Sequence, residues 1–270
     1  MSLIKQQTNK PQELLGTQTA FKFVSEETLK TLGICWEPGT DRFRFDINLE
    51  VPAKRASKRN ILSRIAQLYD PLGLIAPVII VVKIMMQQLW ILSLGWDDDV
   101  PQEIQQKWIQ FCEQLPNLSA LRIDRFAFVQ QFVSVELHCF SDASETAYGA
   151  CIYARSKTAD GELKITLLSS KSRVAPLKRI SLPRLELCGA LVAARLYERV
   201  VSAMNMDLDR TVFWTDSTVV LEWLKSSPHN WKTFVANRTS EIQSITHGCC
   251  TLPGPKTRLI WFLEECPPAN

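Results

Sequence analysis

The stretch from Gln131 to Arg173, QFVSVELHCFSDASETAYGACIYARSKTADGELKITLLSSKSR, decides the fold of this chain. Apolar and polar residues alternate through QFVSVELHCFSDAS, which is typical of a half-buried strand. The runs AYGACIYAR and LKITLLSSKSR read as a second and a third strand. Asp160-Gly161 between these two runs is a strong signal for a hairpin turn. The stretch therefore predicts three consecutive strands.

A helix and a fourth strand follow this stretch. Residues 181–201 have the pattern of a helix, with Ser181 as a plausible N-cap and Pro183 in the first turn. TVFWTD, residues 211–216, predicts the fourth strand, and residues 217–225 and 231–245 predict two further helices. The order of three strands, helix, strand and helices predicts an α/β fold, in which a mixed sheet has flanking helices.

The first half of the chain has a different pattern. LGICWEPGTDRFRFDINLEV, residues 32–51, predicts a β-hairpin that turns at Pro38-Gly39. Three helices are predicted after it, over residues 54–69, 74–92 and 101–115, and Pro101 is expected in the first turn of the third. A mainly helical region therefore precedes the strands.

Composition limits the class of protein. The chain has 270 residues, 46% of them hydrophobic and 22% charged, which suits one large or two modest globular domains and excludes a disordered chain. The net charge of +3 is too small to establish a polyanionic partner. The eight cysteines form no CxxC pair, the N-terminus is polar, and the apolar run at residues 72–82 is too short to span a membrane. We expect an intracellular protein, in the cytoplasm or the nucleus, with no membrane partner.

Three carboxylates occur at the ends of predicted elements. Asp142 ends the first strand in HCFSDASETAYGA, Glu186 opens the helix in ISLPRLELCGAL, and Asp216 ends the fourth strand in TVFWTDSTVVLEW. If the first and fourth strands pair, their carboxyl ends bring the two aspartates together. Phosphodiester hydrolysis by two metal ions needs several carboxylates at one point, and Mg²⁺ prefers oxygen ligands. We therefore predict Asp142, Glu186 and Asp216 as catalytic and metal-binding residues.

Each acid also has a purely structural interpretation. An aspartate at a strand end, such as Asp142, is usually a turn or cap residue. Glu186 could be a first-turn acid that interacts with the helix dipole. Asp216 and Ser217 could cap the helix that follows them. It is the combination of the three acids within their surrounding sequence that favours a site.

The sequence around the acids resembles the RNase H region of Bel/Pao-type retrotransposon polyproteins. The resemblance is carried by FSDAS, YGACIY, SKSRVAPLKRISLPRLELCGALVAARL, WTDSTVVLEWL and WKTFVANRTSEIQ. LGICWEPGTDRFRF and RNILSRIAQLYDPLGLIAPVIIVVKIMMQQLW resemble the segment of these polyproteins that follows the reverse-transcriptase palm. The resemblance covers roughly residues 30–248. No single motif in it is decisive, and it is the order and density of the motifs that make a coincidence improbable.

The resemblance implies an RNase H-like fold with a five-stranded sheet. It implies the RNA strand of an RNA–DNA hybrid as the ancestral substrate, with Mg²⁺ or Mn²⁺ as cofactor. Carried over by position, Asp142 would bridge two metal ions, Glu186 would bind one and orient the attacking water, and Asp216 would bind the other. No polymerase, protease or integrase motif is present in the sequence.

The same resemblance divides the chain into four regions. Residues 1–52 are a polar N-terminus and hairpin after a missing palm, and residues 53–130 are a helical connection region. Residues 131–248 are the RNase H-like domain, and residues 249–270 are an atypical tail. Six basic residues and no acid occur from residue 163 to 185. Five residues of this stretch are predicted to contact the nucleic-acid backbone: Lys171, Arg173, Lys178, Arg179 and Arg184.

The tail lacks the fourth carboxylate that the resemblance implies. Similar polyproteins continue with words like ENPADLVSRG, whereas this chain reads GPKTRLIWFLEECPPAN. Back-translation of residues 256–266 in the frame shifted by one base allows Glu-Asn-Pro-Ala-Asp-Leu-Val-Ser-Arg-Gly-Met, and the codons of Trp261 and Phe262 force its valine. We hypothesise that a frameshift near Pro255 replaced the family ending. Codons at the locus that are incompatible with the shifted frame would refute this.

Loss of the fourth acid predicts an incomplete metal site with weak or no nuclease activity. Glu264 and Glu265 follow in the tail, but the sequence gives no reason for them to reach the site. The fifth strand is in doubt for the same reason, although the apolar run LIWFL could cover a sheet edge. Two alternatives remain open: a non-catalytic module that binds nucleic acid, and a non-functional fragment of a decaying element. The sequence does not predict an oligomeric state.

Overall fold

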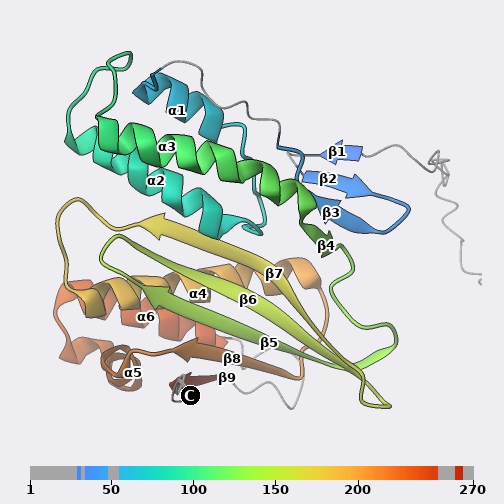
Figure 1. Cartoon of the computed structure of the whole chain (residues 1–270). Coiled ribbons are helices and arrows are strands. Elements are labelled where there is room, and N and C mark those ends of the chain that lie inside the picture. Colours follow the sequence, from blue (N-terminus) through green and yellow to red (C-terminus); the bar gives the residue numbers. More distant parts are fainter. Residues whose placement is uncertain (1–28, 32–33, 48–54, 249–258, 264–270) are drawn as a thin grey trace, which may run out of the picture.

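The computed structural model describes residues 29–31, 34–47, 55–248 and 259–263, with side chains described for 34–47 and 55–246. A five-stranded sheet dominates the second half of the chain (Figure 1). Its strands are β5 (Phe132–Ala143), β6 (Ala147–Thr158), β7 (Leu163–Val174), β8 (Arg210–Thr215) and β9 (Leu259–Leu263), in the spatial order β7-β6-β5-β8-β9. The first three form an antiparallel meander, and β8 runs parallel to β5. The predicted α/β fold with a mixed sheet is confirmed.

Helices cover one face of this sheet. They are α4 (Leu182–Met204), α5 (Thr218–Lys225) and α6 (Thr233–Gly248), with the short 3₁₀ helix η2 (Pro228–Asn230) before α6. From Val135 to Ser141 every second residue of β5 is buried, which places Leu137 and Cys139 under Ala193 and Tyr197 of α4. The alternation seen in the sequence therefore separates two sets of residues. One set faces the helices, and the other set lies on the opposite face of the sheet.

The fifth strand, which the sequence left in doubt, is present. β9 consists of the apolar run LIWFL and pairs in parallel with β8, with Thr215 opposite Leu263. It lies at the edge of the sheet, next to β8 (Figure 1). The atypical tail thus supplies the backbone of the fifth strand.

The upstream part combines a small sheet with three helices. Strands β1 (Leu29–Thr31), β2 (Ile34–Glu37), β3 (Arg42–Arg44) and β4 (Arg122–Asp124) form an antiparallel sheet, in which β2 and β3 are the predicted hairpin. The helices are α1 (Lys58–Ile65), α2 (Ala76–Ile91) and α3 (Gln102–Gln114), followed by η1 (Leu115–Ala120). Pro101 is the N-cap of α3 instead of a residue of its first turn. Within the described residues, no helix is long and apolar enough to cross a membrane.

A loop of the upstream part docks on β7, the edge strand of the large sheet. α2 passes along β7 (Figure 1), and the loop before α2 reaches Ser169 and Ser170. The amide of Ser170 donates to the carbonyl of Leu72 at 2.9 Å, and the Ser169 hydroxyl donates to the same carbonyl at 2.7 Å. The Ser170 hydroxyl donates to the carbonyl of Gly73. These bonds cover backbone groups on an edge that would otherwise be open.

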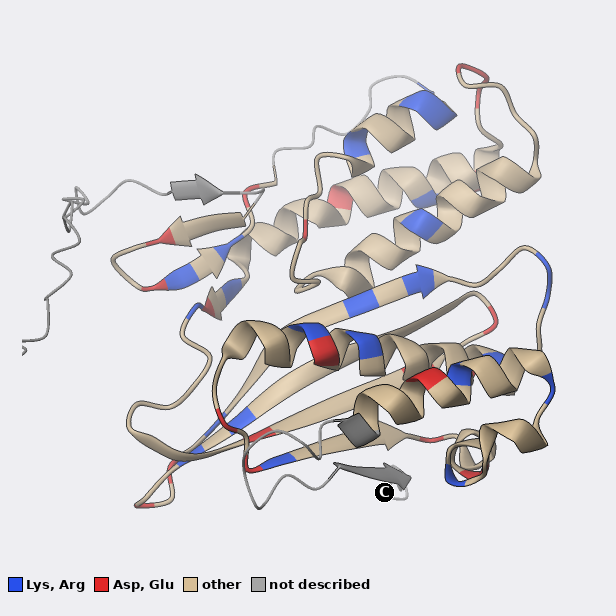
Figure 2. Ribbon diagram, turned by 180° about the vertical axis from the view of Figure 1, so that it is seen from behind, with Lys and Arg blue, Asp and Glu red and all other residues tan. Residues whose placement is uncertain are grey.

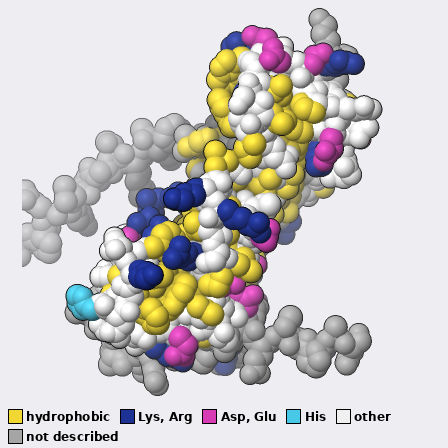
Figure 3. Space-filling view, turned by 90° about the vertical axis from the view of Figure 1, so that its left-hand side faces the viewer, with side chains coloured by type: hydrophobic (Ala, Val, Ile, Leu, Met, Phe, Trp, Pro, Cys, Tyr) yellow, Lys and Arg dark blue, Asp and Glu magenta, His cyan; other side chains and the backbone are white. Residues whose placement is uncertain are grey.

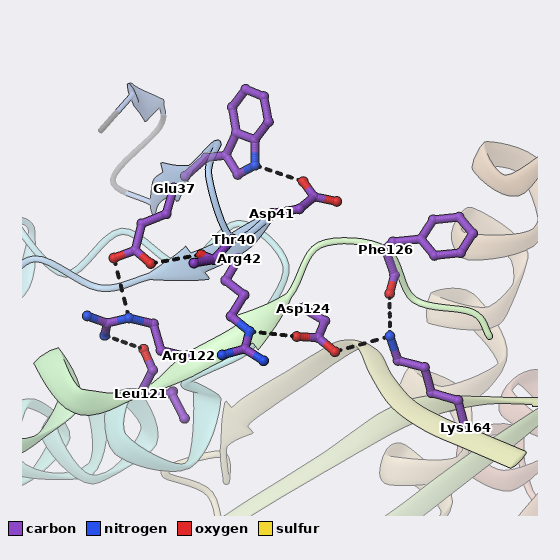
Figure 4. Close-up of polar contacts among 10 residues, drawn as sticks. Glu37, Thr40, Asp41, Arg42, Leu121, Arg122, Asp124, Phe126 and Lys164 are labelled. Atoms are coloured by element: carbon purple, nitrogen blue, oxygen red, sulfur yellow. Dashed lines mark hydrogen bonds and ion pairs between the residues drawn. The ribbon is translucent and has the colours of Figure 1, made fainter. Parts of the chain in front are cut away.

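A polar bridge centred on Asp124 makes a second connection between the two parts (Figure 4). One carboxylate oxygen of Asp124 accepts from Arg42 at 3.0 Å, and the other lies 3.1 Å from the ammonium group of Lys164 on β7. Lys164 also donates to the carbonyl of Phe126 at 2.8 Å. The hydrogen bonds from Lys164 and Arg42 hold the pKa of Asp124 below its ordinary value. The small sheet is thereby tied to β7 by an ion pair between side chains.

Candidate active site

The register of the sheet brings Asp142 and Asp216 to the same end of neighbouring strands. β5 and β8 are parallel, and Phe140 is paired with Trp214. Two residues further along each strand stand Asp142, which is exposed within β5, and Asp216, which is exposed directly after β8. The Ser141 hydroxyl donates to the carbonyl of Trp214 at 3.4 Å and joins the two strands at this level. The carboxyl ends of the two strands thus lie side by side at the same end of the sheet, as the sequence predicted.

Glu186 is linked to the same place through a serine. It lies half-buried in the first turns of α4. The hydroxyl of Ser217 donates to Oε2 of Glu186 at 2.5 Å, and the Ser217 oxygen accepts the amide of Val220 as the N-cap of α5. Ser217 therefore fulfils the capping role, and the carboxylate of Asp216 is not required for it. The sequence identified the cap but not its bond to Glu186, because the two residues are 31 positions apart.

Helix α4 lies very close to the strand end that carries Asp142. A Cβ atom on Gly189 would lie 3.0 Å from the backbone oxygen of Asp142 and 3.4 Å from that of Gly149. Glycine at this position lets α4 cross directly over the strand end, which is a common use of glycine where two backbones approach. Asp142 itself accepts the amide of Ala143 through Oδ1 at 2.6 Å. One oxygen of this carboxylate is therefore already engaged with the backbone.

The donor set suits a hard divalent cation in chemistry but not in arrangement. Three carboxylates from β5, α4 and the end of β8 supply the oxygen ligands that Mg²⁺ prefers. Among the residues that the structure describes, however, no three acidic, histidine or cysteine side chains converge closely enough to hold a metal ion. Glu264 and Glu265 lie outside the described residues. The structure places the three acids at one end of the sheet without gathering them into a metal centre.

The predicted basic residues line the approach to this end of the sheet. Figure 3 looks onto the end where β5, β7 and β8 finish, and Lys and Arg side chains gather there. Lys171 and Arg173 are exposed on β7, and Lys178 and Arg179 are exposed in the loop between β7 and α4. Arg179 forms an exposed ion pair with Glu145 at 3.0 Å.

Arg184, the fifth predicted basic residue, is packed against an aromatic ring. Its guanidinium carbon lies 5.2 Å from the ring centroid of Phe234 on α6, and that of Arg238 lies 3.6 Å from the same centroid. Arg238 and Arg195 line a cavity of about 220 Å³ together with Arg173. Arg195 makes a bidentate pair with Glu241, at 2.5 and 2.8 Å. Arg195 and Arg238 cannot be singled out from the sequence, because their positions in the helices are typical of ordinary solvent-facing charges.

Comparison with known proteins places this arrangement in a family. The model of the Pao retrotransposon-like RNaseH-like domain matches residues 57–217, which is more than half of the chain. Comparison with curated protein sequences found no match.

Solved structures with similar folds include RNase H1 from the halophilic archaeon Halobacterium salinarum NRC-1, with 12% identity, 47% of this chain and 82% of that chain covered, and a TM-score of 0.28. LC11-RNase H1 in complex with an RNA/DNA hybrid has 11% identity, coverages of 49% and 87%, and a TM-score of 0.31. The foamy viral protease-reverse transcriptase in complex with double-stranded DNA has 12% identity and a TM-score of 0.48, with 90% of this chain and 38% of that chain covered. On the family match, this chain belongs to the Pao retrotransposon-like proteins and carries their RNaseH-like domain.

Proposed function

We propose that the ancestral reaction of this domain is hydrolysis of the RNA strand of RNA–DNA hybrids with Mg²⁺ or Mn²⁺, and that the activity is weak or absent in this chain. Residues 131–248 would form the nuclease-type domain, and residues 53–130 would form the connection region that precedes it. Asp142, Glu186 and Asp216 would be the remaining metal-binding acids.

Asp142 and Asp216 lie at equivalent positions at the ends of the neighbouring strands β5 and β8, and this placement supports the ancestral reaction. Two exposed carboxylates on adjacent rigid strands are suited to holding a divalent cation against a phosphate, because both can turn toward the same point. Glu186 enters from α4 at this end of the sheet, through its bond with Ser217. One solved RNase H1 with a similar fold is recorded in complex with an RNA/DNA hybrid, which fits this class of substrate.

The state of the acids supports the impaired activity. Oε2 of Glu186 is engaged by Ser217, and Oδ1 of Asp142 is engaged by its own neighbouring amide. A metal ion would have to compete with these hydrogen bonds and draw the three carboxylates together. The fourth acid of the family pattern is replaced in the tail sequence, so one ligand that would assist this reorganisation is missing.

A hybrid-cleavage assay tests the proposal. The full chain is incubated with an RNA–DNA hybrid in Mg²⁺ and separately in Mn²⁺, beside a version in which residues 256–266 are replaced by ENPADLVSRGM. We expect little or no cleavage by the chain itself and faster cleavage by the version with the family ending. Asp142→Asn in the second version should abolish cleavage. Efficient cleavage by the unaltered chain that is lost in Asp142→Asn would show that the site is complete without the fourth acid.

A non-catalytic binding module is the second candidate, favoured by the exposed cations Arg173, Lys178 and Arg179. Phosphate contacts by lysine and arginine need no metal ion and give affinity without sequence preference. Under this reading, binding of the hybrid survives Asp142→Asn and is weakened by Lys178→Glu. If both variants bind as the unaltered chain does, the basic loop is not a contact surface.

A further inference from the structure

Four cations from three elements gather where the upstream part meets the large sheet. They form what we call the junction cluster: Lys83 of α2, Lys171 and Arg173 of β7, and Arg199 of α4. All four residues are exposed. α2 lies against β7, and α4 packs on β6 and β7, so the three elements border one surface. Figure 2 shows α2 passing along β7, whose carboxyl-terminal half carries basic positions.

The charges of this cluster act on one another. Partial burial lowers the pKa of Lys171, and repulsion from Arg199, Arg173 and Lys83 lowers it further. Neighbouring cations of the two parts are neutralised, as in the pairs Arg195–Glu241 and Lys164–Asp124. Within the described part of the chain, no ion pair joins a member of the junction cluster to an acid, although Asp70 is close enough to feel the charge of Lys83. Like charges held together in this way destabilise the compact state unless a counter-charge binds.

We propose that the junction cluster binds the phosphate backbone of a nucleic-acid duplex, so that the duplex contacts the connection region and the RNase H-like domain together. β7 runs directly from Lys171 and Arg173 toward the basic loop with Lys178 and Arg179. Cations spaced along this path match the repeating charge of a phosphate backbone better than they match a single small anion. The inference rests on the proposed nucleic-acid binding, but it adds the contribution of α2 and of the far part of α4.

Rigid docking of the two parts makes such a shared surface effective. The Leu72 carbonyl is held by Ser169 and Ser170 of β7, the strand that carries Lys171 and Arg173. The position of Lys83 relative to the β7 cations is therefore set by the fold instead of by a flexible linker. A preorganised row of charges loses less entropy on binding than charges on separately moving parts.

The test measures binding of a fluorescently labelled RNA–DNA hybrid to the full chain by anisotropy over a range of salt concentrations, with EDTA present to prevent cleavage. The variants are Lys83→Glu and Arg199→Glu, neither of which alters the acids or the basic loop. Lys157→Glu is the matched control, because Lys157 is an exposed cation at the opposite end of β6 and the change in net charge is the same. Lys83→Gln removes the charge without placing a new acid near Asp70.

Loss of one phosphate contact lowers the slope of log affinity against log salt by about 0.9, which corresponds to roughly eightfold in affinity for a tenfold change in salt. We expect this change in both junction variants and a smaller decrease in Lys157→Glu. Junction variants that bind no more weakly than Lys157→Glu, while the unaltered chain binds, would overturn the junction surface alone. An unaltered chain that does not bind the hybrid at all would overturn both the proposed nucleic-acid binding and this inference.

Discussion

Replacing Gly73 by alanine should detach the loop before α2 from strand β7 of the large sheet. Its φ is +78°, and a Cβ atom there would lie 1.8 Å from the backbone oxygen of Ser170. The left-handed conformation costs a non-glycine residue about 1–2 kcal/mol. Ser170 lies within β7, opposite Cys151 of β6, so its backbone cannot retreat from the loop without disturbing the pairing of the two strands. In Gly73→Ala the loop must therefore leave β7.

Leaving β7 removes the three hydrogen bonds that Leu72 and Gly73 accept from Ser169 and Ser170. Each is worth about 0.5–1.5 kcal/mol net, so with the backbone term the expected loss in the free energy of unfolding is roughly 4 kcal/mol. The measurement is urea unfolding followed by tryptophan fluorescence, with hydrogen exchange of the Ser170 amide as a local probe.

Gly161→Ala is the matched control for this prediction. Gly161 also has a positive φ, +98°, but nothing lies within 4 Å of its Cβ position. Only the backbone cost of about 1–2 kcal/mol applies to it. If Gly73→Ala loses no more stability than Gly161→Ala and the Ser170 amide stays protected, the docking described for Leu72 and Gly73 is wrong.

Three further outcomes are expected. Ser217→Ala removes the N-cap of α5 and the bond to Glu186, and should lower the free energy of unfolding by about 1–2 kcal/mol in a thermal or urea melt. Asp124→Asn should cost up to about 1 kcal/mol near neutral pH, because its ion pairs with Arg42 and Lys164 are partly exposed. The folded-state pKa of Asp124 lies below the unfolded value of 3.8, so this stabilisation exists above that value and is lost as pH falls through the folded pKa; urea midpoints should converge for the two proteins in acid. A double-mutant cycle of Arg195→Ala and Glu241→Ala should give a coupling of about 0.2–1 kcal/mol, and no coupling would show that the bidentate pair does not persist in solution.

Local patterns in the sequence were sufficient for most of the elements. The alternation through β5, the Asp160-Gly161 turn and the helix-start signal at Ser181 and Pro183 each act over a few residues, and the structure confirms the strands and the helix that they predicted. Ser181 is the N-cap residue of α4, but its side chain makes no capping hydrogen bond. The spacing of strand and helix also placed Asp142 and Asp216 at strand ends, which the parallel register of β5 and β8 brings together.

Long-range contacts could not be predicted in the same way. β4 joins the hairpin of β2 and β3 from some 80 residues away, through the pairing of Arg42 with Asp124. Leu72 meets Ser169 across 97 positions. Neither segment has a sequence pattern that identifies the segment it pairs with, because a short strand or a loop carbonyl can pair with many backbones. The proximity of Lys83 to the cations of β7 likewise could not be predicted, because it depends on the packing of α2 against β7.

The tail strand β9 shows that a fold and its chemistry tolerate change to different degrees. A short apolar run without proline can satisfy the open hydrogen-bonding edge of β8, and the run that does so here differs from the ending that the resemblance implies. A metal ligand, by contrast, requires a side chain with a suitable oxygen donor at one particular position. A shift of reading frame at this place would therefore spare the architecture while removing the reactivity. Shape alone is then a poor guide to whether a copy of such an element still works, and the sequence of its last few residues is a better one.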